Sequence, residues 1–170
     1  YQSRLDDEVG QKVGETDTTL DCRETVVRRE ESNMGNFIAE TMRSYTGADV
    51  AVQNGGSIRT DTQYEPGTLT HRDVINILPF GNEVTVLEVS GETVRAVLEN
   101  GVSEVERLSG RFPQVAGLQY TYDPSNEVGS RIVEASLNGN PIDPAGTYTM
   151  ATNNFIADGG DGYEMLTSVP

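Results

Sequence analysis

Helical and extended hydrophobic patterns alternate along this sequence. Apolar residues recur at helical spacing after Asn33, which is suited to N-cap a helix that ends near Gly47, and again after Gly91. Apolar runs at 48–53 and 148–152 are typical of buried strands. The interleaving of the two patterns predicts a single α/β domain, bordering on α+β, in which helices separate the strands of a mixed sheet.

Local signals predict several further elements. Thr70 to Asp73 resembles a capping box, with Asp in place of Glu, and opens a short helix that Pro79 ends. Strands are expected around 84–89, 118–122 and 132–137, the last followed by a hairpin turn at Asn138-Gly139. Residues 1–19 are mostly polar and predict an irregular lead-in segment or an edge strand. The domain proper is expected to span 20–170.

The charge of the chain limits its partners. Its 170 residues include 27 Asp and Glu against 12 Lys and Arg, a net charge of −15, and Lys12 is the only lysine. Such a charge repels nucleic acid and disfavours an anionic membrane surface. Acidic residues with almost no lysine are typical of a protein that works at very high salt, although an ordinary acidic protein is the alternative.

Histidine and cysteine, two residue types that often act in catalysis or bind metal ions, are scarce in this sequence. His71 is the only histidine and Cys22 the only cysteine, so neither a His-rich dinuclear metal centre nor a Cys-based zinc site is expected. His71 opens a predicted helix and is expected at the surface or in a cap, and Cys22 is expected to be an inert small residue. The chain by itself therefore predicts a binding role rather than complete catalytic machinery.

Two glycine-rich loops each follow a predicted strand. The first contains Asn54-Gly55-Gly56, and the second, at 155–163, contains Gly160-Asp161. Ligands bind α/β sheets at the carboxyl ends of strands, and glycines let backbone N–H groups approach them. A tight turn is the alternative for each loop taken singly. Together the loops predict a binding site.

Aromatic and charged residues lie near these loops. Phe80 stands between Pro79 and Gly81 and is either a core residue or a platform on which a flat ring stacks. With Phe155 it could hold a nucleobase. Asp161 could bind ribose hydroxyls. Arginines suited to hold a phosphate or carboxylate are Arg28, Arg29 and Arg59.

Four motifs in this order resemble a known family. They are ESNMGN at 31–36, NGGSIR at 54–59, PFGN at 79–82, and NF with GGDGY at 154–163. The chain resembles, over about residues 20–168, the C-terminal substrate-binding domain of the 5′-nucleotidase family, which includes UDP-sugar hydrolases and 2′,3′-cyclic-nucleotide phosphodiesterases. The resemblance implies an N-terminal metallophosphoesterase domain outside this chain, with two divalent metal ions of the Zn or Mn type. It also implies that this chain alone is not catalytically competent.

The resemblance assigns roles to the motif residues. Phe80 and Phe155 would stack on the base, and Asp161 would bind the ribose. Asn54 and Arg59 would contact the nucleoside and its phosphate region. Arg28 would be a further substrate arginine. The motif glycines counted with this site are Gly55, Gly56, Gly81 and Gly160.

One departure from the family pattern lies on the phosphate side. Family members often carry a second arginine three residues before the motif asparagine, Asn33, and this chain has Glu30 there, with Arg29 as an extra cation.

Other functions stay open at this stage. A scaffold or dimerisation module that has lost substrate recognition is the main alternative, and a homodimer is possible. A hydrolase complete in this chain would need a metal-ligand set that the sequence does not supply. The resemblance also implies a location outside the cytoplasm. The base and the substrate, whether monophosphate, cyclic phosphate or UDP-sugar, are not determined.

The charge pattern generates a prediction about salt. We expect the folded chain to keep its circular-dichroism spectrum and its ligand affinity in molar KCl, because screening removes the repulsion among excess carboxylates. Spectra and ligand titrations across a KCl series measure this. Unfolding or loss of affinity at high KCl would contradict the halophile interpretation.

Overall fold

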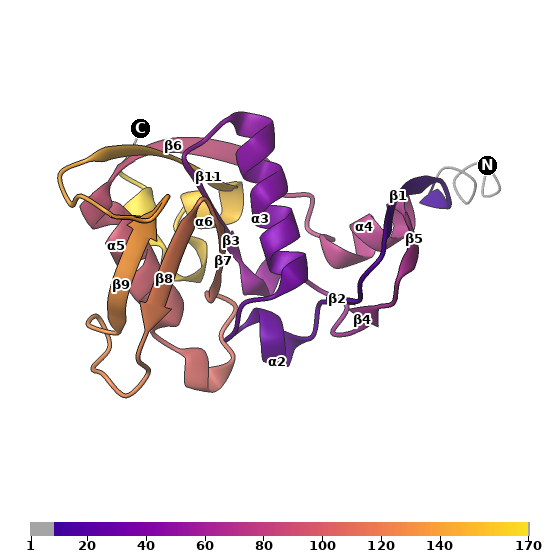
Figure 1. Cartoon of the computed structure of the whole chain (residues 1–170), viewed down its shortest axis with the longest axis horizontal. Helices are drawn as coiled ribbons and strands as arrows, with labels where there is room; N and C mark the ends of the chain where they lie inside the picture. The colour runs from indigo at the N-terminus through magenta and orange to yellow at the C-terminus, as the bar shows by residue number, and fades with distance from the viewer. Residues whose placement is uncertain (1–8, 170) are drawn as a thin grey trace.

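The computed structural model of the chain describes residues 9–169 (Figure 1). Its central element is a four-stranded sheet in the order β6-β11-β3-β7. The strands are β3 (Val50–Asn54), β6 (Val84–Ser90), β7 (Pro113–Ala116) and β11 (Thr147–Asn153). Strand β11 pairs in parallel with β3 and antiparallel with β6, while β3 pairs antiparallel with β7. The sheet is therefore mixed, as the sequence predicts.

Helices cover both faces of this sheet. Because side chains alternate along a strand, Ala51 of β3 faces one way and Val50 and Val52 the other. Ala51 packs with α3 (Asn33–Thr46) in a cluster made mainly of alanines. Val50 and Val52 belong to the main core, to which α5 (Gly91–Val102) contributes its apolar face. The α/β architecture is confirmed, with the sheet between α3 and α5.

Smaller sheets flank this unit. A three-stranded sheet contains β8 (Leu118–Tyr122), β9 (Ile132–Leu137) and β10 (Asn140–Pro141). Asn138 and Gly139 join β9 to β10 with positive φ angles of 51° and 79°, which confirms the predicted hairpin turn. Two two-stranded sheets pair β1 (Lys12–Thr16) with β5 (Gly67–Thr70) and β2 (Leu20–Asp21) with β4 (Gln63–Tyr64). In Figure 1, β8 and β9 lie at the left-hand end and β1 and β5 at the right.

The remaining helices are short. They are α2 (Glu24–Val27), α4 (His71–Ile77) and α6 (Asn154–Ala157). Single 3₁₀ turns are η1 (Gly55–Ser57), η2 (Val105–Arg107), η3 (Gly160–Gly162) and η4 (Glu164–Leu166). The predicted capping box of α4 is present, because Thr70 accepts from the Asp73 N–H and the Asp73 carboxylate accepts from the Thr70 N–H. Gly47 ends α3 with a left-handed φ of 71°, also as predicted.

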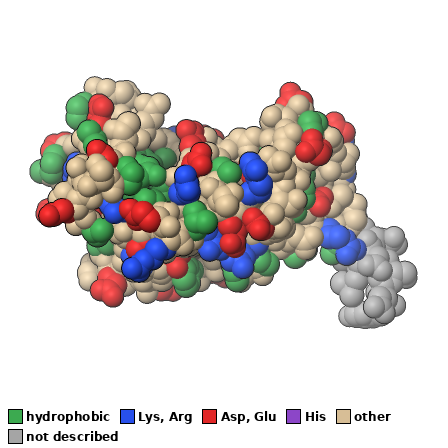
Figure 2. All heavy atoms as spheres, turned by 90° about the horizontal axis from the view of Figure 1, so that it is seen from below, with side chains coloured by type: hydrophobic (Ala, Val, Ile, Leu, Met, Phe, Trp, Pro, Cys, Tyr) green, Lys and Arg blue, Asp and Glu red, His purple; other side chains and the backbone are tan. Residues whose placement is uncertain are grey.

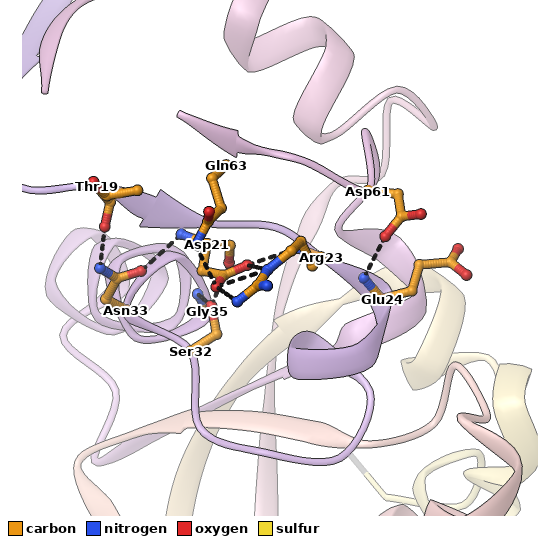
Figure 3. Close-up of polar contacts among 9 residues, drawn as sticks. All are labelled: Thr19, Asp21, Arg23, Glu24, Ser32, Asn33, Gly35, Asp61 and Gln63. Carbon is orange, nitrogen blue, oxygen red and sulfur yellow. Dashed lines mark hydrogen bonds and ion pairs between the residues drawn. The ribbon is translucent and has the colours of Figure 1, made fainter. Parts of the chain in front are cut away.

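The predicted cap of α3 at Asn33 is wrong by one residue. The Ser32 hydroxyl is the N-cap and accepts a hydrogen bond from the Gly35 N–H at 3.3 Å (Figure 3). Asn33 is already helical, and its amide is used elsewhere: its Oδ1 accepts from the Asp21 N–H and its Nδ2 donates to the Thr19 carbonyl. Asn33 therefore joins α3 to β2, a contact that local pattern does not reveal.

Part of the predicted lead-in is a strand. Residues 12–16 form β1 and pair with β5, while residues 1–8 lie outside the described part of the chain.

Arginines are used in ion pairs on this acidic surface. On the face shown in Figure 2, basic and acidic side chains lie next to each other. Arginines whose guanidinium lies within 4.0 Å of a carboxylate are Arg23, Arg28, Arg29, Arg43, Arg59, Arg95, Arg107, Arg111 and Arg131.

Cys22 can report on a second, smaller hydrophobic cluster, which is separate from the main core. It is fully buried with Val27, Met34 and Ile58, and burial raises the pKa of its thiol to about 11. At pH 8 the native thiol is then almost entirely neutral, whereas an unfolded cysteine is partly ionised. We expect a disulfide reagent such as DTNB to leave the native chain unlabelled at pH 8 and to label it fully in guanidinium chloride. Rapid stoichiometric labelling of the native chain would contradict this burial.

Candidate functional site

The two glycine-rich loops leave the same edge of the sheet. Strands β3 and β11 run in parallel and end side by side at Asn54 and Asn153. After β3 the chain enters η1. After β11 it enters α6, so Phe155 lies on a short helix rather than in the loop expected from the sequence.

Asn54 is the centre of a buried amide network. Its Oδ1 accepts from the Ser57 hydroxyl at 2.6 Å and from the Asn153 amide at 2.9 Å, and its Nδ2 donates to Asp161 Oδ2 at 2.7 Å. Because the two acceptor contacts fix the amide, the Asn54 Nδ2 must face Asp161. Asn54 thus orients the Asp161 carboxylate, and Asn153, which the sequence pattern does not single out, orients Asn54.

The backbone of Asp161 is also held in place. Its φ of 53° is left-handed, and its carbonyl accepts from the Asn100 side chain at 3.2 Å. Tyr163, fully buried behind it, donates its hydroxyl to the Arg111 carbonyl at 2.5 Å, and burial raises the pKa of that hydroxyl. The Asp161 carboxylate therefore reaches the sheet edge from a loop that is fixed to α5 and to the segment before β7.

The backbone N–H groups of Gly55 and Gly56 donate within the protein rather than to a ligand. The Gly55 N–H donates to the Phe112 carbonyl at 2.7 Å and the Gly56 N–H to the Gly110 carbonyl at 2.8 Å. A Cβ on Gly55 would lie 2.0 Å from the Val27 carbonyl oxygen. These glycines thus allow close packing of the loop against neighbouring backbone. The expectation that their N–H groups are available to a ligand is not met, because both are already donated within the protein.

Phe80 and Phe155 lie at the surface. Their side chains are 59% and 43% exposed, so the core-residue alternative for Phe80 is wrong. The Arg59 guanidinium carbon lies 5.7 Å from the centre of the Phe80 ring. Gly160 is needed beside Phe155, since a Cβ there would lie 2.5 Å from the ring. Gly81, with φ of 65°, turns the chain after Phe80.

Asn154 ties the two phenylalanine segments together. Its Oδ1 accepts from the Glu83 N–H and its own N–H donates to the Glu83 carbonyl, both at 2.9 Å. Phe155 follows Asn154 directly, and the Phe80 loop ends at Glu83. The spacing of the two rings therefore depends on this pair of hydrogen bonds.

Arg28 and Arg59 also line the site. Arg28 donates to the Leu108 carbonyl and pairs with Glu24 at 2.6 Å, while Arg59 donates to the Gly56 carbonyl. Arg29 is different, because its side chain is exposed and lies 3.8 Å from Glu30.

These side chains surround one cavity. Its volume is about 530 Å³, within the range of small-molecule sites. The residues that line it are Arg28, Asn54, Gly56, Ser57, Arg59, Phe80, Asn82, Gly110, Phe155 and Asp161. Most of the sequence-predicted site residues therefore meet in one place. Gly55, Gly81, Gly160 and Arg29 do not line the cavity; the three glycines support residues that do.

Gln114 supports the Arg28 segment and was missed by sequence reasoning. This buried residue of β7 donates to the carbonyls of Val27 and Glu30 at 3.0 and 2.8 Å and accepts from the Ser32 N–H at 3.0 Å. A Cβ on Gly35 would lie 2.3 Å from the Gln114 side-chain oxygen. Gly35, in the ESNMGN motif, thus makes room for Gln114.

Within residues 9–169, no group of three or more His, Cys, Asp or Glu side chains could hold a metal ion. Nor does any helix in this range have the length and apolar character needed to cross a membrane.

The chain is an α/β domain with a cavity at one edge of its central sheet, and comparison assigns it to a family. The family model described as the C-terminal domain of 5′-nucleotidase matches residues 12–168. The chain belongs to this family.

Two relatives are much longer than this chain. The trifunctional nucleotide phosphoesterase YfkN of Bacillus subtilis is 41% identical over 98% of this chain and 12% of its own length. Protein UshA of Escherichia coli is 35% identical over 100% of this chain and 30% of its own length.

Solved structures share the fold. A 5′-nucleotidase precursor from Thermus thermophilus is 39% identical with a TM-score of 0.92, covering 99% of this chain and 34% of its own. The NAD nucleotidase of Haemophilus influenzae is 29% identical with a TM-score of 0.84. The match covers 98% of this chain and 32% of the nucleotidase. The chain thus spans between 12% and 34% of the length of these proteins.

Gln114 gives a stability prediction. In Gln114→Leu, the carbonyls of Val27 and Glu30 and the Ser32 N–H lose their side-chain partner. We expect the free energy of unfolding to fall by roughly 3 kcal/mol, measured by urea titration. Gln119→Leu, at an exposed position of β8, is the matched control and should change it by about 0.5 kcal/mol or less. Equal effects of the two changes would contradict a bridging role for Gln114.

Proposed function

We propose that this chain is the nucleoside- or nucleotide-binding domain of a 5′-nucleotidase-type phosphohydrolase. The observation that carries the proposal is the cavity, where two exposed phenylalanines, a fixed carboxylate and two arginines from distant parts of the chain come together. A nucleotide has a matching set of groups: a flat base, ribose hydroxyls and a phosphate.

Each part of the cavity suits one part of such a ligand. Phe80 and Phe155 stack on the two faces of the base, which contributes about 1–3 kcal/mol per stacked base in other proteins. Asp161, oriented by Asn54, accepts hydrogen bonds from the ribose hydroxyls. Arg28 and Arg59 hold the phosphate side by charge-assisted hydrogen bonds.

Catalysis in this proposal takes place on another domain. Two divalent metal ions on an N-terminal domain outside this chain would activate the water that attacks the phosphorus. This chain contributes binding energy on the base and ribose, which places the phosphate for attack. The membership of the chain in a family with phosphoesterase relatives supports this division of roles. A location outside the cytoplasm and a homodimeric state stay predictions.

A scaffold that has lost its ligand is less well supported. It predicts a blocked slot or phenylalanines turned into the core, whereas both rings are exposed and line an open cavity.

Removing one ring tests the stacking. We expect Phe155→Ala to weaken adenosine binding by about tenfold, measured by calorimetric titration, because one stacking face is lost. Phe37→Ala is the matched control, since Phe37 of α3 is 60% exposed and does not line this cavity. Equal adenosine affinity of Phe155→Ala and the unmodified chain would rule out the stacking role.

A further inference from the structure

Glu24 lies between the two arginines of the phosphate side. Its Oε1 is 2.6 Å from Arg28 Nη2 and 4.0 Å from Arg59 Nη1. No motif in the sequence points to it. With its carboxylate counted, the three side chains carry a net charge of +1 rather than the +2 of the arginines alone.

The position of Glu24 is set by its surroundings. It is the first residue of α2, so Arg28 follows one helical turn later, at a spacing that favours side-chain pairing. Its backbone N–H donates to Asp61 Oδ1 at 2.9 Å (Figure 3). The neighbouring Arg23 donates hydrogen bonds to Asp21 and holds the pKa of that carboxyl below its usual value. Arg23 is therefore paired with Asp21 and not with Glu24. Glu24 is therefore directed to Arg28 by a fixed helix start.

Protein acceptors already use two of the five N–H groups of Arg28. Its side chain is only 17% exposed; Nη2 contacts Glu24, Nη1 donates to the Leu108 carbonyl, and Nε is buried with no hydrogen-bond partner among the described residues. A phosphate binds arginine best through two parallel N–H groups. Here it has to share the guanidinium with Glu24 or displace it.

We propose that Glu24 is a specificity-determining residue, an internal anion that weakens the binding of ligands in proportion to the negative charge they place beside Arg28 and Arg59. This inference rests on the proposed function. A phosphate dianion meets more repulsion from the Glu24 carboxylate than a cyclic phosphate monoanion, and an uncharged nucleoside meets none. The carboxylate thus reduces the advantage of a nucleotide over a nucleoside.

The alternative role for Glu24 is to position Arg28 for the ligand. The two roles predict opposite results when the charge is removed. Without an internal anion, phosphate binding tightens; without a positioning residue, phosphate binding weakens.

The test compares adenosine, 2′,3′-cyclic AMP and AMP. They are titrated at pH 8 and low ionic strength, where AMP is a dianion, into the unmodified chain, Glu24→Gln and Glu30→Gln. Glu30→Gln is matched in charge, because Glu30 is exposed and lies near Arg29, outside the cavity lining. We expect Glu24→Gln to raise the ratio of AMP to adenosine affinity by about five- to tenfold, with a smaller gain for the cyclic phosphate. Glu30→Gln should leave the AMP-to-adenosine and cyclic-AMP-to-adenosine affinity ratios within about twofold, because Glu30 is exposed to water, whose high dielectric constant weakens its interaction with a ligand in the cavity.

Each possible result supports or overturns the proposal. A gain for Glu24→Gln that follows ligand charge and shrinks as KCl is added supports it. An unchanged or lower AMP-to-adenosine ratio, or an equal gain in Glu30→Gln, overturns it while leaving the proposed function intact if adenosine still binds. Failure of the unmodified chain to bind adenosine at all would overturn the proposed function and this inference with it.

Discussion

The site depends on the parallel pairing of β3 with β11. Val50 pairs with Met150 and Ala51 with Ala151, and the Thr152 hydroxyl donates to the Val52 carbonyl at 2.8 Å. Parallel strands need a long connection, and here the intervening chain supplies α4, β6, α5 and the β8–β9 hairpin. Because both strands end at one edge, whatever follows each of them is brought to the same place. Without this register, the cavity would not form.

The residues that join these segments are carboxamides. Asn54, Asn153, Asn154 and Gln114 each connect backbone or side chains that are far apart in sequence. An amide supplies both donors and acceptors without a charge. In a chain with a net charge of −15, a further buried carboxylate would be costly, whereas a buried amide adds no charge and needs only hydrogen-bond partners. Uncharged, hydrogen-bonded amide side chains thus hold the exposed groups of the cavity in position.

Much of the fold could be predicted from local signals. The helices after Asn33 and Gly91, the capping box at Thr70 and the Asn138-Gly139 turn depend on neighbouring residues, and the pattern of the sequence contains them. The resemblance also pointed to most of the residues that line the cavity, although not to Ser57, Asn82 or Gly110. The contacts of these amide side chains could not be predicted in this way. The partners of Gln114, for example, lie more than eighty residues away in the sequence.

Two local expectations failed for the same reason. The chemistry of Asn33 suits an N-cap, but its amide is taken by β2, so Ser32 fills that role. The Gly55 and Gly56 N–H groups were expected to approach a ligand, but they are donated to the segment before β7. In both places a tertiary contact overrides what the local sequence favours.

The backbone of Asp161 has an evolutionary consequence. Its left-handed φ is one that glycine adopts freely and other residues adopt at a cost of about 1 kcal/mol or more. Gly159 and Gly162, with φ of 92° and 79°, flank it in the same kind of conformation. Replacing this aspartate with glycine would relieve that cost but would leave the Asn54 Nδ2 without its carboxylate acceptor. Under the proposed function, a descendant with glycine at this position has also lost the carboxylate that contacts the ribose.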